Sequence, residues 1–208
     1  MTIQEKIVAL ADSYAQKLKQ KMDQRVLEME TDDQSHYLLY QVLGISTKEG
    51  QLIDVYQNKG RFLYKYAGSF LEEATLLCFE EKFEHAQRKV KIPNQSGSRP
   101  KTFEIDCLVD HQAYEIKRRD ATTDGDHITK EHTRVQSIKN SGYTPIRIMF
   151  YYPNRTQAIR IQETLQTVYA GVEGQYYFGN AAREFVKTVT GVDLLGILES
   201  IAREQASD

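Results

Sequence analysis

The spacing of apolar residues changes twice along this chain of 208 residues. From residue 3 to residue 83, apolar side chains recur every three or four positions, which is the repeat of an amphipathic helix. Between residues 102 and 152 the chain carries short runs that are typical of β-strands, and after residue 156 the helical repeat returns. Helical segments on both sides of a β-containing centre predict an α/β fold.

Local signals divide the helical parts. Gly44 closes one short helix, and Ser46 with Glu49 has the spacing of a capping box that opens the next. Gly60 is expected to end that helix. The pattern predicts helices over residues 3–29, 37–43, 46–60, 61–83, 156–170, 180–190 and 193–203.

The central part reads as strands joined by loops. We expect loops over 93–100 and 119–128, strands over 102–109, 113–118 and 145–152, and a helix over 129–140. The chain then has a helical N-terminal subdomain over 1–60 packed on a core over 61–155. C-terminal helices over 156–208 complete the same globular unit.

Charge is unevenly distributed, although the net charge is only −2. Residues 85–160 carry an excess of six positive charges, and the segments before and after each carry an excess of four negative charges. A basic centre is a reasonable footprint for a cleft that binds a polyanion. Chance clustering of exposed charges explains the same distribution equally well.

Several function classes are excluded by what the sequence lacks. No apolar run approaches the roughly 18 residues of a membrane span, so no membrane partner is expected. The phosphate-binding pattern G-x-x-x-x-G-K-[ST] does not occur, so no nucleotide cofactor is expected. Cys78 and Cys107 lie among apolar neighbours, which is typical of buried, reduced thiols and predicts a cytoplasmic location.

The most informative group of residues lies on the predicted hairpin. Asp106 is on its first strand, and Glu115, Ile116 and Lys117 are on its second. Because side chains alternate along a strand, Glu115 and Lys117 point to one face while Ile116 points into the core. The turn brings Asp106 opposite them, so two carboxylates and one ammonium converge.

This convergence suits a magnesium site. Mg²⁺ prefers oxygen ligands and keeps several waters, so Asp106, Glu115 and the backbone carbonyl of Ile116 could hold it. A bound Mg²⁺ activates water and neutralises charge on a phosphate that the water attacks. Lys117 could stabilise the transition state of that attack. Ordinary surface charge pairs produce the same short pattern by chance, so its context has to support the interpretation.

The surrounding sequence adds a resemblance. Ile105-Asp106 followed by Glu115-Ile116-Lys117 resembles the core of the PD-(D/E)xK nucleases, with Ile105 where the family name has Pro. The run from Lys117 to Ile128 resembles the ApaLI-like type II restriction endonucleases in particular. The resemblance implies a helix, a three-stranded meander, a helix and a further strand in a mixed sheet, with helical N- and C-terminal additions.

The same resemblance implies roles for individual residues. Asp106 and Glu115 would be metal ligands, and Lys117 the catalytic lysine. The family often adds an acid from the preceding helix, for which Glu72 is the candidate and Glu73 the rival.

DNA contacts are expected on the loop and helix that follow the catalytic strand. Arginine can pair with guanine and aspartate with cytosine, although contacts to phosphate are commoner. The candidates are Arg118, Arg119, Asp124, His127, Lys130 and Arg134. The expected function is Mg²⁺-dependent cleavage of double-stranded DNA at a short palindromic site by a homodimer. A structure-specific repair or recombination nuclease and a non-catalytic DNA-binding module remain as alternatives.

Overall fold

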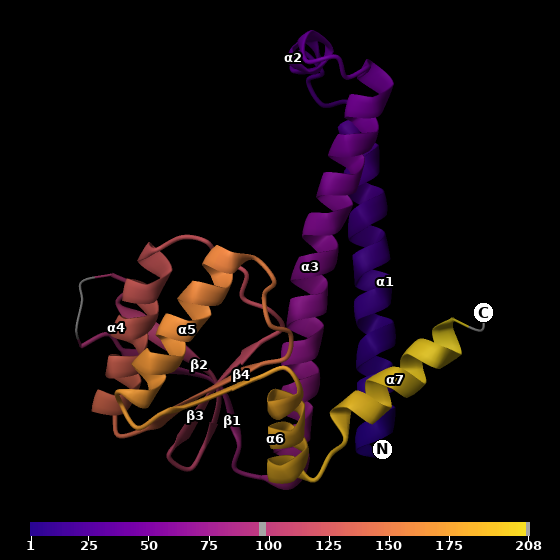
Figure 1. Cartoon of the computed structure of the whole chain (residues 1–208). Helices are drawn as coiled ribbons and strands as arrows, with labels where there is room; N and C mark the ends of the chain where they lie inside the picture. Colours follow the sequence, from indigo (N-terminus) through magenta and orange to yellow (C-terminus); the bar gives the residue numbers. More distant parts are fainter. Residues whose placement is uncertain (96–98, 207–208) are drawn as a thin grey trace. The chain divides into compact units, whose positions relative to one another are not determined.

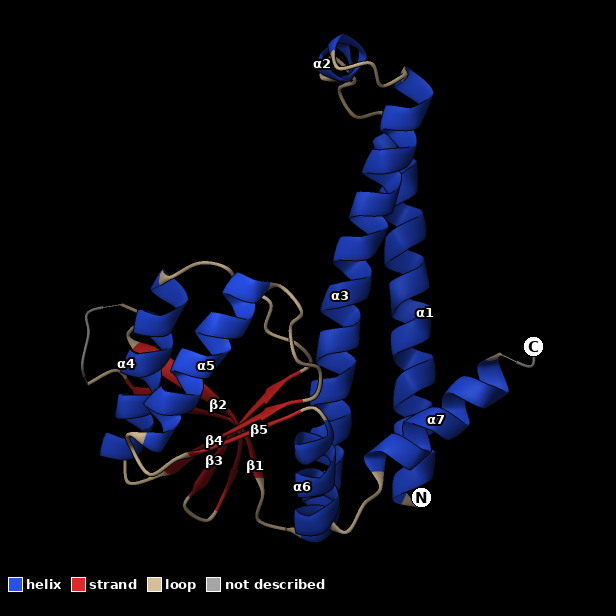
Figure 2. Ribbon diagram, in the orientation of Figure 1, coloured by secondary structure: helices blue, strands red, loops and turns tan. Residues whose placement is uncertain are grey.

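The computed structural model describes residues 1–95 and 99–206 (Figure 1). Three residues of the loop predicted over 93–100, and the last two of the segment predicted over 156–208, lie outside the described residues. In chain order, the helices and strands (Figure 2) are α1 (Ile3–Met29), α2 (Tyr37–Val42), α3 (Thr47–Lys82), β1 (Gln87–Pro93), β2 (Thr102–Val109), β3 (Gln112–Lys117), α4 (Asp126–Asn140), β4 (Thr144–Met149), α5 (Thr156–Ala170), β5 (Gln175–Phe178), α6 (Asn180–Thr190) and α7 (Leu194–Gln205).

The chain divides into two compact units. Val8–Phe70 forms a helical unit, and Met1–Ile7 together with Leu71–Asp208 forms an α/β unit. The divisions fall within α1 and α3, so each of these helices contributes residues to both units. Among the described residues, none of the helices combines the length and the apolar character that crossing a membrane requires.

The helical unit contains α2 and most of α1 and α3. Tyr14 of α1 packs edge-on against Tyr66 and Phe70 of α3, with ring centroids 6.2 and 5.8 Å apart. The Ser46 hydroxyl accepts a hydrogen bond from the Glu49 N–H at 3.2 Å, as the capping box predicts.

One expectation in this unit is wrong. The helices predicted over 46–60 and 61–83 are a single helix, because Gly60 lies inside α3 rather than after its end. An internal glycine costs a helix only about 1 kcal/mol, and the apolar repeat that continues on both sides outweighs that cost.

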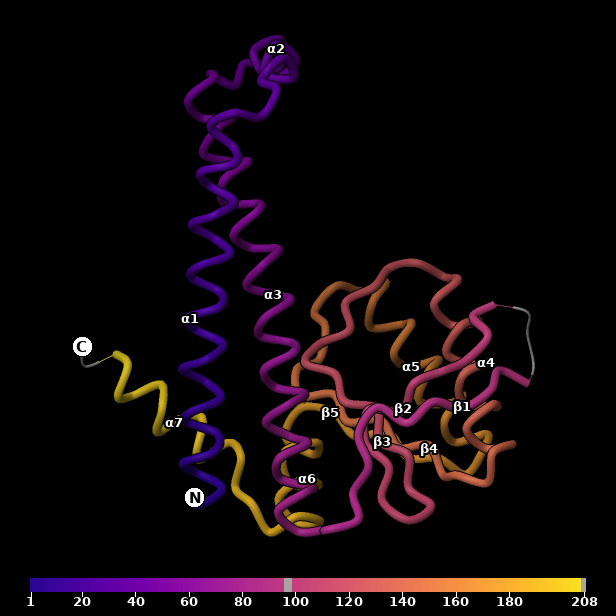
Figure 3. The backbone as a smooth tube through the Cα atoms, turned by 180° about the vertical axis from the view of Figure 1, so that it is seen from behind, coloured from indigo at the N-terminus to yellow at the C-terminus, as the bar shows by residue number. Residues whose placement is uncertain are grey.

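The α/β unit is built on a five-stranded mixed sheet in the order β1-β2-β3-β4-β5. The pairs β1–β2 and β2–β3 are antiparallel, whereas β3–β4 and β4–β5 are parallel; Figure 3 shows the sheet from behind. The three antiparallel strands form the expected meander, and α4 and α5 provide the two crossovers. The mixed sheet with an α/β arrangement confirms the predicted fold class.

The sequence pattern missed the two edge strands and overextended a third. Positive side chains interrupt the apolar alternation in β1, and β5 has only four residues, so neither produces a strong strand signal. The strand predicted over 145–152 ends at Met149. Beyond Met149, the Phe150 N–H still donates to the carbonyl of Lys117 in β3, and the Tyr151 N–H donates to the carbonyl of Arg118.

Helices cover both faces of the sheet. On one face, Glu131 of α4 pairs with Arg147 of β4, and Tyr169 of α5 contacts Tyr176 of β5. On the other face, Phe79 of α3 stacks on Tyr114 of β3 with ring centroids 4.4 Å apart. Phe185 of α6 stacks on Tyr177 of β5 on that second face.

The parallel edge of the sheet requires a glycine at position 174. A Cβ there would lie 2.6 Å from the Pro145 carbonyl oxygen and 3.0 Å from that of Tyr169, and neither backbone atom can move away cheaply. We predict that Gly174→Ala lowers the free energy of unfolding by about 2 kcal/mol.

Urea denaturation measures this change, with Gly171→Ala as the matched control. A Cβ on Gly171 would make only ordinary contacts of 3.4 Å or more, so the control should stay within about 0.5 kcal/mol of wild type. Equal effects of both substitutions would contradict the close approach at Gly174.

Candidate active site

Four polar side chains lie in one row across the sheet. The pair Cys107↔Tyr114 places Asp106 opposite Glu115 on the next position of the hairpin. Glu115 is in register with Arg147, and Arg147 is in register with Tyr176. Because laterally paired residues point to the same face of a sheet, all four lie on the face that α4 and α5 cover.

The hairpin opens at the position of the two carboxylates. Backbone pairing of β2 with β3 stops at Cys107↔Tyr114, and beyond it the Ile116 N–H donates to Asp106 Oδ2 at 2.8 Å. The Lys117 carbonyl accepts from the Phe150 N–H at 3.0 Å, on the β4 side. Because successive carbonyls alternate along a strand, the Ile116 carbonyl points toward β2 and Asp106.

Glu115 is buried between two cations. Its side chain is 2% exposed; Oε2 accepts a hydrogen bond from Arg134 Nη2, and Oε1 lies 2.5 Å from Lys117 Nζ. The contact confirms that Glu115 and Lys117 share a face of β3. Burial lowers the pKa of Arg134, but a guanidinium stays charged in proteins, so the pair is ionic.

An open cleft of about 390 Å³ leads to these groups. It is lined by Pro100, Thr102, Phe103, Glu104, Asp106, Glu115, Lys117, Lys130, Glu131 and Arg134. Five of the residues singled out from the sequence therefore border one cleft. The Lys117 side chain is 38% exposed, so its ammonium can meet a ligand that enters.

The donor set fits a hydrated divalent cation. Among the described residues, no three His, Cys, Asp or Glu side chains come together as a group able to hold a metal ion. The cleft instead offers two carboxylates and one backbone carbonyl, which suits Mg²⁺ because this ion keeps several waters. Glu115 Oε1 has an ion contact with Lys117 Nζ but no well-aligned hydrogen bond from the described residues, so this oxygen still has room for a second cation.

Glu72 and Glu73, the two candidates on the preceding helix, have different partners. Glu72 Oε1 lies 2.7 Å from Lys89 Nζ, whereas Glu73 and Glu80 bind Arg88. Lys89 lies opposite Asp106 in the β1–β2 register and has a left-handed backbone with φ of 55°.

The surroundings of Lys89 connect Glu72 to the site. The hydrogen bond that Lys89 donates to Glu72 raises the pKa of Lys89, and the charges of Glu104 and Asp106 raise it further. Glu72 is therefore the helix acid associated with Asp106, but its carboxylate binds a lysine. Its assignment as a metal ligand stays a prediction.

The residues predicted to contact DNA do not all face solvent. Arg119 is exposed and donates to Asn154 Oδ1 at 2.6 Å, and Arg118 is half-buried. Asp124 is exposed and accepts from the Asp126 N–H at 3.0 Å at the start of α4. Lys130 is exposed on α4 and borders the cleft.

The remaining two candidates are engaged within the protein. His127 Nε2 lies 2.7 Å from Asp120 Oδ2, with the imidazole a quarter exposed. The Arg134 side chain is 12% exposed and donates to Glu115 and to the Glu104 carbonyl. In this arrangement Arg134 holds a carboxylate of the cleft rather than facing the surface.

Sequence reasoning missed a set of buried charges behind the cleft. Arg147 is fully buried; Nη1 donates to Glu131 Oε2 at 2.8 Å, and Nη2 donates to Asp120 Oδ2 at 2.5 Å. Arg134 Nη1 lies 3.7 Å from Glu131 Oε1. Side chains of alternating acidic and basic character thus form one series of contacts through Glu115, Arg134, Glu131, Arg147 and Asp120, with His127 paired to Asp120 at its end.

This series of contacts, which we name the buried charge chain, explains the ionisation of Asp120. Burial alone would raise the pKa of Asp120, but the hydrogen bond from His127 and the charge of Arg147 hold it well below its ordinary value. The sequence holds one indication of the buried charge chain: Arg147 is the single charged residue of the strand Thr144–Met149.

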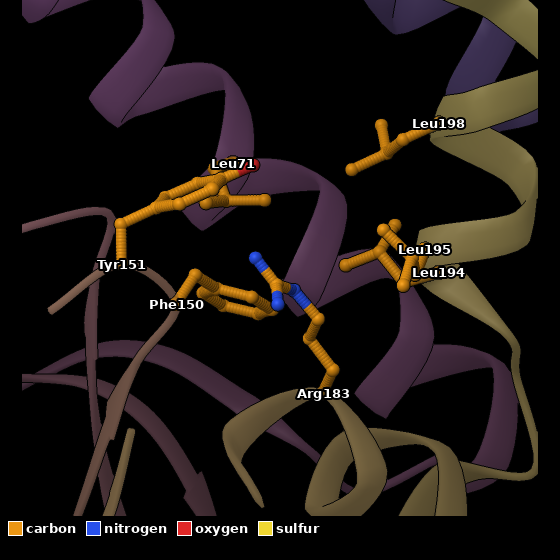
Figure 4. A pocket seen from close by; sticks show the side chains of 7 residues that line it. All are labelled: Leu71, Phe150, Tyr151, Arg183, Leu194, Leu195 and Leu198. Carbon is orange, nitrogen blue, oxygen red and sulfur yellow. The ribbon is translucent and has the colours of Figure 1, made fainter. Parts of the chain in front are cut away.

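A second hollow of the α/β unit does not suit a substrate. Figure 4 shows Arg183 of α6 projecting among Leu71, Phe150, Tyr151 and three leucines of α7. The Arg183 guanidinium carbon lies 5.1 Å from the Tyr151 ring centroid. The enclosed volume is about 10 Å³, which is room for one water molecule at most.

The buried charge chain predicts a large effect of removing its central cation. Arg147→Met removes the cation that both Asp120 and Glu131 share, leaving Asp120 with His127 alone and Glu131 with Arg134 alone. We therefore expect the free energy of unfolding at neutral pH to fall by about 3–5 kcal/mol. The exposed Arg160→Met on α5 is the matched control and should change it by less than about 0.5 kcal/mol.

The deficit should depend on pH with a defined sign. The folded-state pKa of Asp120 is lowered, so its stabilisation is fully present above the ordinary value of 3.8 and is lost as the pH falls below it. Urea denaturation at neutral and acidic pH should therefore show the gap between Arg147→Met and wild type narrowing in acid. A gap that widens in acid would contradict this electrostatic origin.

Comparison with known proteins relates the chain to a family of nucleases. The family model of the ApaLI-like restriction endonucleases matches residues 1–203. Searches of curated proteins and of solved structures returned no match. The family match spans nearly the whole chain, and the α/β fold is consistent with a PD-(D/E)xK-like core, as the sequence resemblance implied. The chain belongs to the ApaLI-like restriction endonuclease family and is a deoxyribonuclease that hydrolyses phosphodiester bonds of DNA.

Proposed function

We propose that this restriction endonuclease is a type II enzyme that cuts double-stranded DNA at a short palindromic site, with Mg²⁺ as cofactor and as a homodimer. The observation that carries the proposal is the convergence of Asp106, Glu115 and Lys117 at one open cleft. The basic excess of residues 85–160 supports a polyanionic substrate. The buried, reduced thiols of Cys78 and Cys107 support a cytoplasmic location.

Asp106, Glu115 and the Ile116 carbonyl are the proposed metal ligands. When bound, Mg²⁺ would supply an activated water and neutralise charge that develops on the scissile phosphate. Asp106 is held in place because Oδ2 accepts the Ile116 N–H, which leaves Oδ1 for the ion. Arg134 fixes Glu115 from behind through Oε2, so Oε1 is the oxygen turned toward Lys117.

Lys117 is the proposed electrophilic group. Its ammonium shares a strand face with Glu115 and is partly exposed at the cleft, where it can donate to a phosphate oxygen or orient the attacking water. A compact ammonium can do this at one point in space, whereas the neighbouring Arg118 is directed to the other side of the strand.

DNA contacts are proposed for the loop after β3 and for the exposed side of α4. Arg118, Arg119, Asp124, His127 and Lys130 lie there, and Lys130 also borders the cleft. The sequence also predicts a DNA contact for Arg134. Its ion pair with Glu115 supports a different role, which is to position that carboxylate. Contacts to phosphate would fix the register on the duplex, and those to base edges would select the sequence.

Plasmid digestion tests the proposal directly. With Mg²⁺, wild type should give discrete fragments from a plasmid of known sequence. Asp106→Asn should not cut, because the amide can still accept the Ile116 N–H but no longer offers a carboxylate to the ion. Glu115→Ala should be inactive for the same reason.

Glu104→Gln is the matched control, because Glu104 is a half-exposed acid of the same cleft outside the ligand set. It should cut at close to the wild-type rate, while Asp106→Asn should retain DNA binding in a shift assay. Nicking only at branched or damaged DNA would favour the structure-specific nuclease. Binding without any metal-dependent cleavage would favour a non-catalytic module.

Single-turnover cleavage at saturating enzyme separates Lys117 from Arg118. Lys117→Ala should lower the rate by orders of magnitude with little change in DNA affinity, since it removes a charge placed at the reacting phosphate. Lys117→Arg should restore little, because a planar guanidinium is bulkier than an ammonium. Arg118→Ala should act mainly on binding. A larger loss of single-turnover rate in Arg118→Ala than in Lys117→Ala would refute these roles.

A further inference from the structure

Helix α3 carries two apolar faces within the helical unit, and the described residues cover only one of them. Its inner face contacts α1: Tyr66 packs on Tyr14, and Asn58 accepts a hydrogen bond from Arg25. With 3.6 residues per turn, an outer face lies roughly opposite. That outer face, which we name the outer stripe, consists of Leu52, Ile53, Tyr56, Gly60, Leu63 and Tyr64.

The outer stripe is strongly exposed for such residues. Leu52, Ile53 and Leu63 are each 49% exposed, and the two tyrosines are 64% and 69% exposed. None of its six residues is charged. Ile53, Tyr56, Gly60 and Leu63 follow the three-four-three spacing of a coiled-coil seam, which on a helix predicts packing against another helix.

Gly60 lies in the middle of the outer stripe and is not required by the chain's own packing. A Cβ at this position would meet nothing within 4 Å among the described residues. A glycine inside a helix costs about 1 kcal/mol relative to alanine, so the fold alone gives no reason for it. An empty space on an apolar seam is what a large side chain of a neighbouring helix can fill.

Helix α2 carries a second group of exposed apolar side chains in the same unit. It lies against the first turns of α3, where Tyr40 donates to Asp54 at 3.3 Å, and it exposes Leu38, Leu39, Val42 and the adjoining Leu43 by 65–78%. The nine large side chains together expose on the order of 1,000 Å², compared with the roughly 800 Å² that each partner contributes to a standard interface. Patches this large mark interaction sites.

We propose that the outer stripe, extended by α2, is the surface through which two copies of this chain associate. The partner is a second copy because, in a twofold interface, each copy presents the same surface to the other. The outer stripe is uncharged and nearly symmetric along the helix, so it can pair with the same stripe of a second copy. The two α3 helices would run antiparallel, with Tyr56 against Gly60 of the partner subunit and Ile53 near Leu63 of the partner subunit. This inference rests on the homodimer of the proposed function and assigns it a surface.

Sedimentation of the full chain without DNA or metal tests the surface. Wild type should be dimeric at about 10 µM, where an interface with a Kd of about 1 µM is assembled. Leu63→Glu should raise the Kd at least 100-fold, because it places two carboxylates in one apolar seam. Leu63 is half exposed, so the variant should fold with an unchanged far-UV circular dichroism spectrum.

Lys65→Glu, exposed on the same helix outside the outer stripe, is the matched control and should remain dimeric. A monomeric wild type, or a Leu63→Glu variant that dimerises as wild type does, would overturn the proposal. Neither result depends on cleavage, so a failure here is distinct from a failure of the proposed enzymatic mechanism.

Cross-linking with a short bis-maleimide tests the antiparallel orientation. The native thiols of Cys78 and Cys107 are buried and should not react. The double variant Ile53→Cys, Leu63→Cys should give covalent dimers in high yield, because each new thiol meets the other in the partner. Ile53→Cys alone should give few, because ten residues of antiparallel helix, about 15 Å, separate the two copies of that thiol. Efficient cross-linking of the single variant would indicate parallel helices and overturn the orientation.

Discussion

The pairing of Arg147 with Asp120 and Glu131 is the constraint on which the cleft-bearing face of the sheet depends. A fully buried guanidinium is tolerated in a sheet only when carboxylates neutralise it, and the two that do so come from the loop after β3 and from α4. The ion pairs therefore fix that loop and that helix against the sheet. Arg134, three residues after Glu131 on α4, contacts both Glu131 and Glu115 and so connects Glu115 to the same ion pairs.

The opened hairpin shows how the fold places two buried carboxylates beside the cleft while the Ile116 N–H keeps a hydrogen-bond partner. A regular ladder would have paired β2 and β3 through their backbones at Asp106 and Glu115. Here the Asp106 carboxylate accepts the Ile116 N–H, so the donor is satisfied while the strands separate. The gap leaves the Ile116 carbonyl facing the same place as the carboxylates. Sheet geometry alone thus assembles three oxygen donors at one level.

Sequence reasoning located what depends on neighbouring residues and missed what depends on distant ones. The hairpin, the shared face of Glu115 and Lys117 and the position of Asp106 opposite them all follow from alternation and a short turn, and the structure confirms them. The continuity of α3 through Gly60 was missed, since packing along the whole helix outweighs one weak residue. The inward direction of Arg134 was also missed, because it depends on burial by elements far away in the sequence.

The formal charges of the four groups at the opened part of the hairpin balance. Asp106 and Glu115 contribute two negative charges, and Lys117 and Arg134 contribute two positive ones. A pair of uncompensated carboxylates would repel the phosphates of a duplex, but this neutral arrangement does not. With Mg²⁺ as the proposed cofactor, recognition of DNA and loading of the cation would be separable events. The protein would approach a duplex with a neutral centre, and the cation would give that centre its net positive charge.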